Sequence, residues 1–282
     1  MGYFVRLILK MNDLFNIKRI LPSPFNFTGS KYKLMPVLKS FIPDDYKCVY
    51  DLFCGGGSFF INSGISTVYA NDIIKPLIEF YLFLQNNEWG KVIEQIYSHN
   101  IDKNQNEYNE LRNRFNQNKN CIDFYILCCS CTNNMMRFNK KFEFNQTWGN
   151  RHFNKNIENK LCGYHNCIFN NTNYHFANIS FEKAVIDQDK CLVYLDPPYL
   201  ITEAGYNCYW SLDLEKQLYN YLDKLHSDNI KFLMSNVLFH KGKNNPFYDR
   251  IKKYDIINIK GNYNKVSRAG QSDSQEIVVK NY

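Results

Sequence analysis

Short apolar runs rich in β-branched and aromatic residues alternate with helix-like stretches along the chain. Turn-forming residues bound each run, and this arrangement is typical of parallel strands that are covered by helices. Strands are predicted at residues 48–53, 67–70, 191–195, 231–234, 254–259 and 276–280. The hydrophobic pattern therefore predicts an α/β fold built around one central sheet.

Two amphipathic helices are predicted from the spacing of large apolar residues. One begins after Ser211, whose hydroxyl suits an N-cap, and its apolar face consists of Leu214, Leu218, Leu222 and Leu225. The other begins near Lys31, and its apolar side consists of Leu34, Leu38 and Phe41. We expect each apolar stripe to pack on the sheet.

Residues 76–178 interrupt the alternation and predict an inserted, mostly helical second domain. The core domain then comprises residues 24–75 and 179–282, and residues 1–23 form an N-terminal extension whose role is open. In the tract 133–153, basic and aromatic side chains are interleaved: Arg137, Phe138, Lys140, Lys141, Phe142, Phe144, Trp148, Arg151 and Phe153. This tract is either a nucleic-acid-binding surface or a solvated loop or hairpin that its aromatic rings anchor.

Composition and charge narrow the class of protein. The chain has 282 residues, of which 45% are hydrophobic and 22% charged, as is usual for a globular protein. No apolar run approaches the roughly 18 residues that a membrane span needs, so we expect a cytoplasmic, intracellular protein without membrane contact. The net charge of +7 suits an anionic partner without requiring one.

The ten cysteines are expected to be reduced thiols, because no export signal is evident. Five residues have a spacing that can complete a tetrahedral zinc site: Cys128, Cys131, Cys162, His165 and Cys167. Cys128 and Cys131 nevertheless fall in an apolar stretch, where small thiols pack well in a core. Buried thiols are therefore favoured over a metal site.

A glycine-rich segment follows the first predicted strand, in which Asp51-Leu-Phe-Cys runs into Gly55, Gly56 and Gly57. Backbone without side chains at the carboxyl end of a strand lets a ligand lie directly against the chain. Asp72 comes just beyond the next strand, where a carboxylate can reach the two hydroxyls of a ribose, or can cap a helix. The spacing is not G-x-G-x-x-G, so a dinucleotide fingerprint does not fit, but a cofactor site is favoured.

A second polar segment, Asp196-Pro197-Pro198-Tyr199, follows another apolar strand. Two prolines fix the backbone and leave carbonyls free to accept hydrogen bonds. The Asp196 carboxylate and the Pro197 carbonyl can each accept one N–H of an exocyclic amine, while the ring of Tyr199 stacks on the attached heterocycle. A rigid Pro-Pro turn is the alternative, but it accounts less well for the whole run.

Together these motifs resemble the Dam-type (D12 class) DNA adenine-N6 methyltransferases, which use S-adenosylmethionine. In that family a segment like residues 27–31 comes first, followed by segments like residues 51–57 and 71–72, the target-recognition insertion, and D-P-P-Y. The order matches, and the resemblance runs from about Pro24 to the end of the chain. It is closest to the Dam enzymes of T-even phages.

The resemblance implies a Rossmann-like S-adenosylmethionine-dependent methyltransferase fold whose helical insertion is the DNA target-recognition domain. Residues implied to contact the cofactor are Phe27, Lys31, Asp51, Phe53, Gly55, Gly56, Gly57 and Asp72. Residues implied to hold the target adenine are Asp196, Pro197, Pro198 and Tyr199. Residues implied to contact DNA are Asn134, Arg137, Lys140 and Arg151.

The implied activity is methylation of adenine N6 in double-stranded DNA at GATC, by base flipping and direct in-line transfer. Two alternatives stay open: a DNA-binding relative that has lost catalysis, and an RNA adenine-N6 methyltransferase. No obligate protein partner is expected. Whether the protein accompanies a restriction nuclease is left open.

Overall fold

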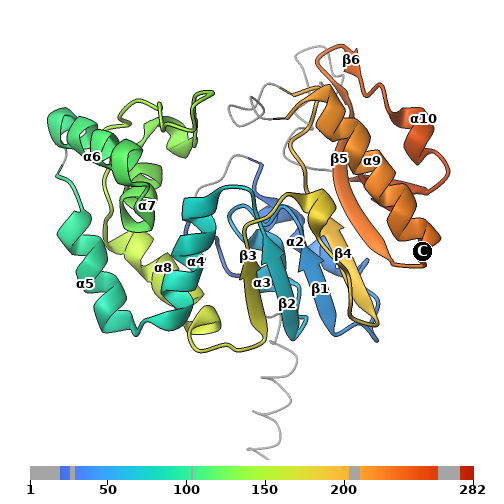
Figure 1. Ribbon diagram of the computed structural model, residues 1–282, viewed down its shortest axis with the longest axis horizontal. Helices are drawn as coiled ribbons and strands as arrows, with labels where there is room; N and C mark the ends of the chain where they lie inside the picture. Colours follow the sequence, from blue (N-terminus) through green and yellow to red (C-terminus); the bar gives the residue numbers. More distant parts are fainter. Residues whose placement is uncertain (1–19, 26–28, 103, 203–209, 260–273) are drawn as a thin grey trace, which may run out of the picture.

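The structure, a computed structural model, describes residues 20–25, 29–102, 104–202, 210–259 and 274–282. A central sheet has the strand order β3-β2-β1-β4-β5-β8-β7, and the short β6 pairs with β5 (Figure 1). Strands from β3 to β5 are parallel, whereas β8 is antiparallel to its neighbours β5 and β7. The predicted Rossmann-like α/β fold is confirmed. The strands are β1 Cys48–Asp51, β2 Thr67–Asn71, β3 Tyr174–Ala177, β4 Cys191–Leu195, β5 Phe232–His240, β6 Lys243–Asn244, β7 Asp255–Ile259 and β8 Ser274–Lys280.

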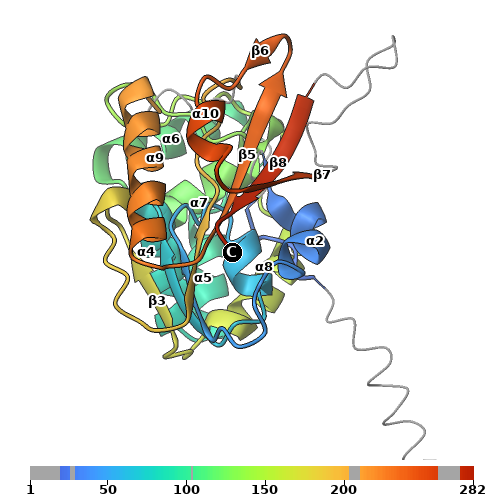
Figure 2. The same cartoon turned by 90° about the vertical axis from the view of Figure 1, so that its right-hand side faces the viewer.

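Helices cover both faces of the sheet. Successive residues of a strand point to opposite faces, so a strand that is apolar throughout needs a covering layer on each face. In β4, Leu192 and Tyr194 belong to one hydrophobic cluster. Val193 and Leu195 belong to the other. Figure 2 shows α9 and α10 on one side of β5 and α2 on the other. The helices packed on the two faces are α2 Met35–Lys39, α3 Ser58–Asn62 and α4 Lys75–Asn86, and opposite them α9 Leu212–Ser227 and α10 Tyr248–Ile251.

Both predicted amphipathic helices are confirmed. Ser211 is the N-cap of α9, and its hydroxyl accepts a hydrogen bond from the Leu214 amide at 3.2 Å. Near Lys31 the chain forms a 3-10 turn, η1 Lys31–Leu34, that continues into α2. Among the described helices, none combines the length and the apolarity that a crossing of the bilayer requires.

The structure differs from the strand predictions mainly at three places. The first strand ends at Asp51 rather than at residue 53, because the chain turns at Leu52 toward the glycines. The strand predicted at residues 231–234 continues to His240, since β8 pairs along its whole length. The sequence analysis missed β3, a short strand at the sheet edge whose residues alternate between half-buried and exposed.

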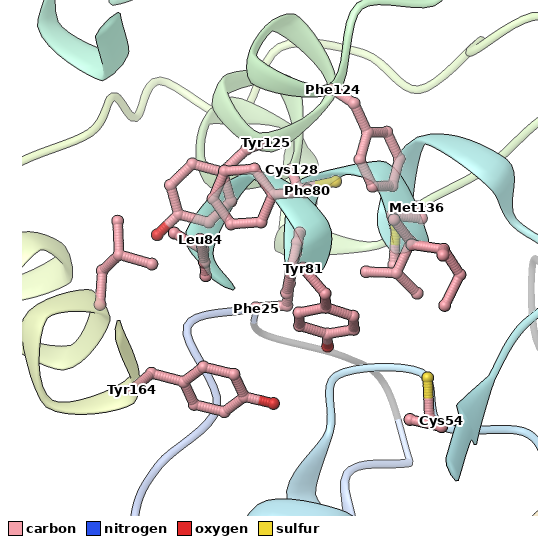
Figure 3. Packing of buried hydrophobic residues seen from close by; sticks show 14 of the residues in the cluster. Phe25, Cys54, Phe80, Tyr81, Leu84, Phe124, Tyr125, Cys128, Met136 and Tyr164 are labelled. Carbon is pink, nitrogen blue, oxygen red and sulfur yellow. The ribbon is translucent and has the colours of Figure 1, made fainter. Parts of the chain in front are cut away.

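The inserted helices share a continuous hydrophobic core with one face of the sheet. This core runs from α2, α3 and α4 into the insertion, and α7 is buried along almost its whole length. Figure 3 shows Tyr125 and Phe124 near Phe80, Tyr81 and Phe25. β3 lies within residues 76–178 but pairs with β2, so the last part of the expected insertion belongs to the central sheet. The expected domain boundaries stay a prediction. The remaining helices are α5 Trp89–His99, α6 Gln105–Asn118, α7 Cys121–Ser130, η2 Thr132–Asn134, α8 Lys155–Ile168 and η3 Phe181–Lys183.

The expectation that all ten cysteines are reduced thiols is wrong. Cys48 and Cys191 form a disulfide, because they are register partners in neighbouring strands with Cα atoms 4.4 Å apart. Cys128, Cys129 and Cys131 are free thiols buried at the end of α7. Within the described ranges, no three His, Cys, Asp or Glu side chains converge as metal ligands, so the zinc spacing does not produce a cluster there.

Candidate functional site

The two polar segments meet at one edge of the sheet. Asp51, the last residue of β1, pairs in register with Tyr194 of β4, so the segments that follow these strands lie side by side. Both line a single cavity, as ligand sites commonly do at the carboxyl edge of an open α/β sheet. The predicted site residues that line it are Lys31, Asp51, Phe53, Gly55, Gly56, Asp72, Asp196, Pro197, Pro198 and Tyr199.

The glycine loop, residues 54–57, connects β1 to α3. Gly55 (φ 47°) and Gly57 (φ 73°) have left-handed backbone conformations, which glycine adopts at little cost. The Cys54 amide donates to the Asn71 carbonyl at 2.9 Å, which ties the loop to β2. Gly55 and Gly56 line the cavity, whereas Gly57 is not a lining residue and stands at the N-cap of α3. The cavity wall here is therefore bare backbone.

Asp72 fastens the glycine loop to the start of α4. Its Oδ2 accepts the Gly55 amide at 2.9 Å, and its Oδ1 accepts the Ile74 amide at 2.9 Å. Burial raises the pKa of this carboxyl, and the backbone hydrogen bonds oppose that shift. Asp72 thus caps the chain locally and also lines the cavity, so the capping and the ribose-binding interpretations are compatible.

Asp51 is a buried carboxyl that forms no ion pair with a described side chain. It is 1% exposed, and neither of its carboxylate oxygens is hydrogen-bonded within the part of the chain that the structure describes. Burial raises its pKa well above the usual range, and the nearby Asp196 and Asp72 carboxylates raise it further. An unpaired buried charge is costly, and a cationic group in the cavity would offset that cost. The site therefore fits S-adenosylmethionine, which carries an ammonium and a sulfonium.

Asp196, by contrast, is paired within the protein. Its Oδ1 lies 2.8 Å from the Lys31 Nζ and accepts the Tyr199 hydroxyl at 3.0 Å. The Lys31 side chain is only 5% exposed, also donates to the Gly29 carbonyl at 3.0 Å, and lies 5.2 Å from the centre of the Tyr199 ring. No described residue bonds to Asp196 Oδ2, which leaves that oxygen as an acceptor for a ligand.

The insertion supplies the third wall of the cavity through Met136, Phe138 and Phe142. Phe138 bridges to Phe144 across an irregular hairpin, and these two rings are 5% and 1% exposed. Aromatic side chains therefore anchor the basic tract, as one interpretation of the sequence expected. The other interpretation, a nucleic-acid surface, concerns the exposed side of the same tract.

On that exposed side, the residues predicted to contact DNA differ in the hydrogen bonds that they make within the protein. Arg137 donates from Nε to the Asn145 Oδ1 and from Nη2 to the Asn145 carbonyl, both at 3.0 Å. The Arg151 guanidinium makes no hydrogen bond or ion pair with any described residue. Arg151 lines a small polar hollow together with Asn134, and Lys140 is exposed on the hairpin. None of these four residues lines the main cavity.

Sequence reasoning missed an aromatic corner of the cavity. Phe53 lies 5.2 Å from Phe181 and 5.7 Å from Trp210, measured between ring centroids. Phe181 follows β3, the strand that was not predicted, so a correct strand assignment would have brought it to this edge. Phe27, expected to contact the cofactor, lies outside the described residues.

Comparison with known proteins agrees with this arrangement. Residues 27–265 match the family described as D12 class N6 adenine-specific DNA methyltransferase. Modification methylase StsI of Streptococcus sanguinis is 31% identical over 94% of this chain and 43% of its own length. Type II methyltransferase M.FokI of Planomicrobium okeanokoites is 31% identical over 93% and 43%. A DNA adenine methylase of Salmonella typhimurium is 28% identical over 74% and 78%. The chain thus spans less than half the length of the first two relatives.

Proposed function

This chain belongs to the D12 class N6 adenine-specific DNA methyltransferases, and on that premise we propose that it transfers a methyl group from S-adenosylmethionine to adenine N6 in double-stranded DNA. One observation carries the proposal. The glycine loop and the Asp196 to Tyr199 segment line the same cavity, so a cofactor and a target base can meet there. Separate cavities would not have allowed direct transfer.

The cofactor half of the cavity is formed by the glycine loop, Asp51 and Asp72. When bound, S-adenosylmethionine supplies a methyl group activated by its positive sulfonium. Asp51 provides a buried negative charge for the ammonium, and the lone pairs left on Asp72 can accept from ribose hydroxyls. The bare backbone at Gly55 and Gly56 allows close approach of the ligand.

The base half is formed by Asp196, Pro197 and Tyr199. The neutral adenine amine is a weak nucleophile, because its lone pair is delocalised into the ring. Asp196 Oδ2 and the Pro197 carbonyl can each accept one amine hydrogen and so raise electron density on the nitrogen. Asp196 then orients and polarises the amine, without acting as a full general base. The target base must leave the duplex to reach this cavity, so base flipping is part of the proposal.

The target sequence is proposed as GATC, from the resemblance of Arg137 and Arg151 to the DNA-reading positions of phage Dam enzymes. An arginine fork matches guanine O6 and N7 in the major groove. The similarity to a modification methylase and to a type II methyltransferase also supports a role beside a restriction nuclease. A particular closeness to the T-even phage enzymes stays a prediction.

The test is methyl transfer from labelled S-adenosylmethionine to a panel of substrates. We expect labelling of N6 in a GATC duplex, weaker labelling of duplexes with one substituted base pair, and none of RNA of the same sequence. Preference for another adenine context would overturn only the target sequence. Labelling of RNA alone would support the RNA methyltransferase instead, and cofactor binding without transfer to any substrate would support the silent relative.

A further inference from the structure

Two buried tyrosines from the first and last helices of the predicted insertion contact the glycine loop. Tyr81 belongs to α4, and its hydroxyl donates to the Gly55 carbonyl at 2.6 Å. Tyr164 belongs to α8. A Cβ atom on Gly57 would lie only 1.8 Å from the Tyr164 hydroxyl oxygen, so this hydroxyl is packed directly against the loop.

The two tyrosines pack against each other. Their rings are stacked with centroids 6.0 Å apart and an interplanar angle of 22°, and both side chains are fully buried. Burial raises the pKa of each hydroxyl well above the usual range, so both stay protonated at neutral pH. Figure 3 shows Tyr81 and Tyr164 facing the segment that carries Cys54, the first residue of the loop.

We propose that Tyr81 and Tyr164 are positioning residues that hold the glycine loop in its cofactor-binding conformation, so that cofactor affinity depends on the insertion. The inference rests on the proposed function. Gly55 and Gly57 both have positive φ, and glycine loses more backbone freedom on ordering than other residues. Tyr81 fixes the loop at Gly55 and Tyr164 limits its movement at Gly57, before any cofactor binds.

The expected consequence follows from pre-organisation. When a loop is already ordered before the ligand binds, the free energy of binding is not reduced by the entropy cost of ordering that loop. Without the Tyr81 hydroxyl, the Gly55 carbonyl loses a buried donor and the free loop can relax. Cofactor binding must then restore the loop, so the dissociation constant should rise while chemistry in the filled site is unchanged.

The experiment compares Tyr81→Phe with Tyr125→Phe by calorimetric titration of the free protein with S-adenosylmethionine. Tyr125 is as deeply buried in the same core, but its hydroxyl makes no hydrogen bond to the glycine loop. Tyr81→Phe should raise the dissociation constant roughly three- to tenfold, as expected for one lost hydrogen bond. Tyr125→Phe should leave it unchanged, and kcat at saturating cofactor should be equal in both.

Each other outcome has a definite meaning. Equal affinity of Tyr81→Phe and wild type would overturn the inference and leave the proposed function intact. An equal rise in both variants would also overturn it, because general loosening of the core would then be the cause. If the wild type binds no S-adenosylmethionine, the proposed function itself fails, and the inference with it.

Discussion

The two halves of the cavity treat charge in opposite ways. In the cofactor half, Asp51 is buried and neither of its oxygens is hydrogen-bonded by a described residue. In the base half, Asp196 is paired with Lys31 and accepts the Tyr199 hydroxyl. One half therefore contains a buried ionisable carboxyl that no described cation balances, whereas the carboxylate of the other half is balanced by Lys31.

This difference corresponds to the ligands proposed for each half. S-adenosylmethionine is cationic, so a site that lacks a protein cation can use the ligand's own charge. Adenine is neutral, and a site for it needs well-placed acceptors without a net charge. The Lys31–Asp196 pair meets both requirements: Lys31 neutralises the charge of the carboxylate, and it fixes the orientation in which the carboxylate accepts hydrogen bonds.

The largest effect should come from removing the acceptor in the base half. Asp196→Ala should lower kcat by about 10²- to 10³-fold, the usual loss for one group that stabilises developing charge. Cofactor affinity should stay close to that of the wild type, because Asp51 and the glycine loop are untouched. Single-turnover methylation and calorimetric titration measure the two quantities.

A matched double variant separates chemistry from folding. Asp196→Ala leaves the buried Lys31 ammonium without its partner, and breaking such a pair costs about 3–5 kcal/mol of stability. Asp196→Ala combined with Lys31→Met should therefore be more stable than the single variant and equally inactive. Recovery of activity in the double variant would contradict the role of Asp196.

The contrast between paired and unpaired groups recurs at the two arginines that are proposed to contact DNA. Arg137 is held by Asn145, whereas Arg151 has no partner among the described side chains, so Arg151 is the better candidate for a guanine reader. Arg151→Ala should cost about 1–3 kcal/mol of discrimination at one base pair. Arg137→Ala should change preference less. Methylation of duplexes with single substitutions in GATC measures both, and a uniform loss across the panel would indicate phosphate contact instead.

Variants of Lys31 test to which half of the cavity this residue belongs. The family resemblance assigns it to the cofactor, but in the structure it is paired with Asp196. Lys31→Met should therefore lower kcat about tenfold with little change in cofactor affinity, and Lys31→Arg should retain most activity because it keeps the charge. A large rise in the cofactor dissociation constant at unchanged kcat would return Lys31 to the cofactor half.

The regions of the molecule also differ in how much of their structure could be predicted from the sequence. Apolar runs bounded by turn-forming residues predicted β1, β2, β4, β5, β7 and β8, because strands of a sheet that helices cover are apolar at most positions. The edge strand β3 was not predicted, since it has only four residues and none of them is fully buried. Motif residues such as Asp51 and Asp196 were found from their place after strands, and their roles stay proposals. The Lys31–Asp196 pair was not predictable, because its partners lie 165 positions apart and only the folded chain joins them.

The smallest effect concerns stability and isolates the unpaired charge of the cofactor half. Asp51→Asn removes a buried ionisable carboxyl while keeping the side-chain shape, so the free protein should gain about 1 kcal/mol or more at neutral pH. For a chain of this size that gain corresponds to a rise in Tm of about 2–4 °C. The same variant should bind S-adenosylmethionine more weakly, because the ammonium loses its partner.

The pH dependence fixes the sign of this effect. The pKa of Asp51 in the folded protein lies well above its ordinary value of 3.8. Below that ordinary value the carboxyl is protonated in both the folded and the unfolded chain, so Asp51 costs nothing. As the pH rises toward the folded pKa, the unfolded chain releases the proton more readily, and the wild type loses stability relative to Asp51→Asn. The difference in Tm between the two proteins should therefore be small near pH 4 and grow toward neutral pH. A difference that is constant across this range would mean that Asp51 has a protein partner, and the contrast between the two halves would fail.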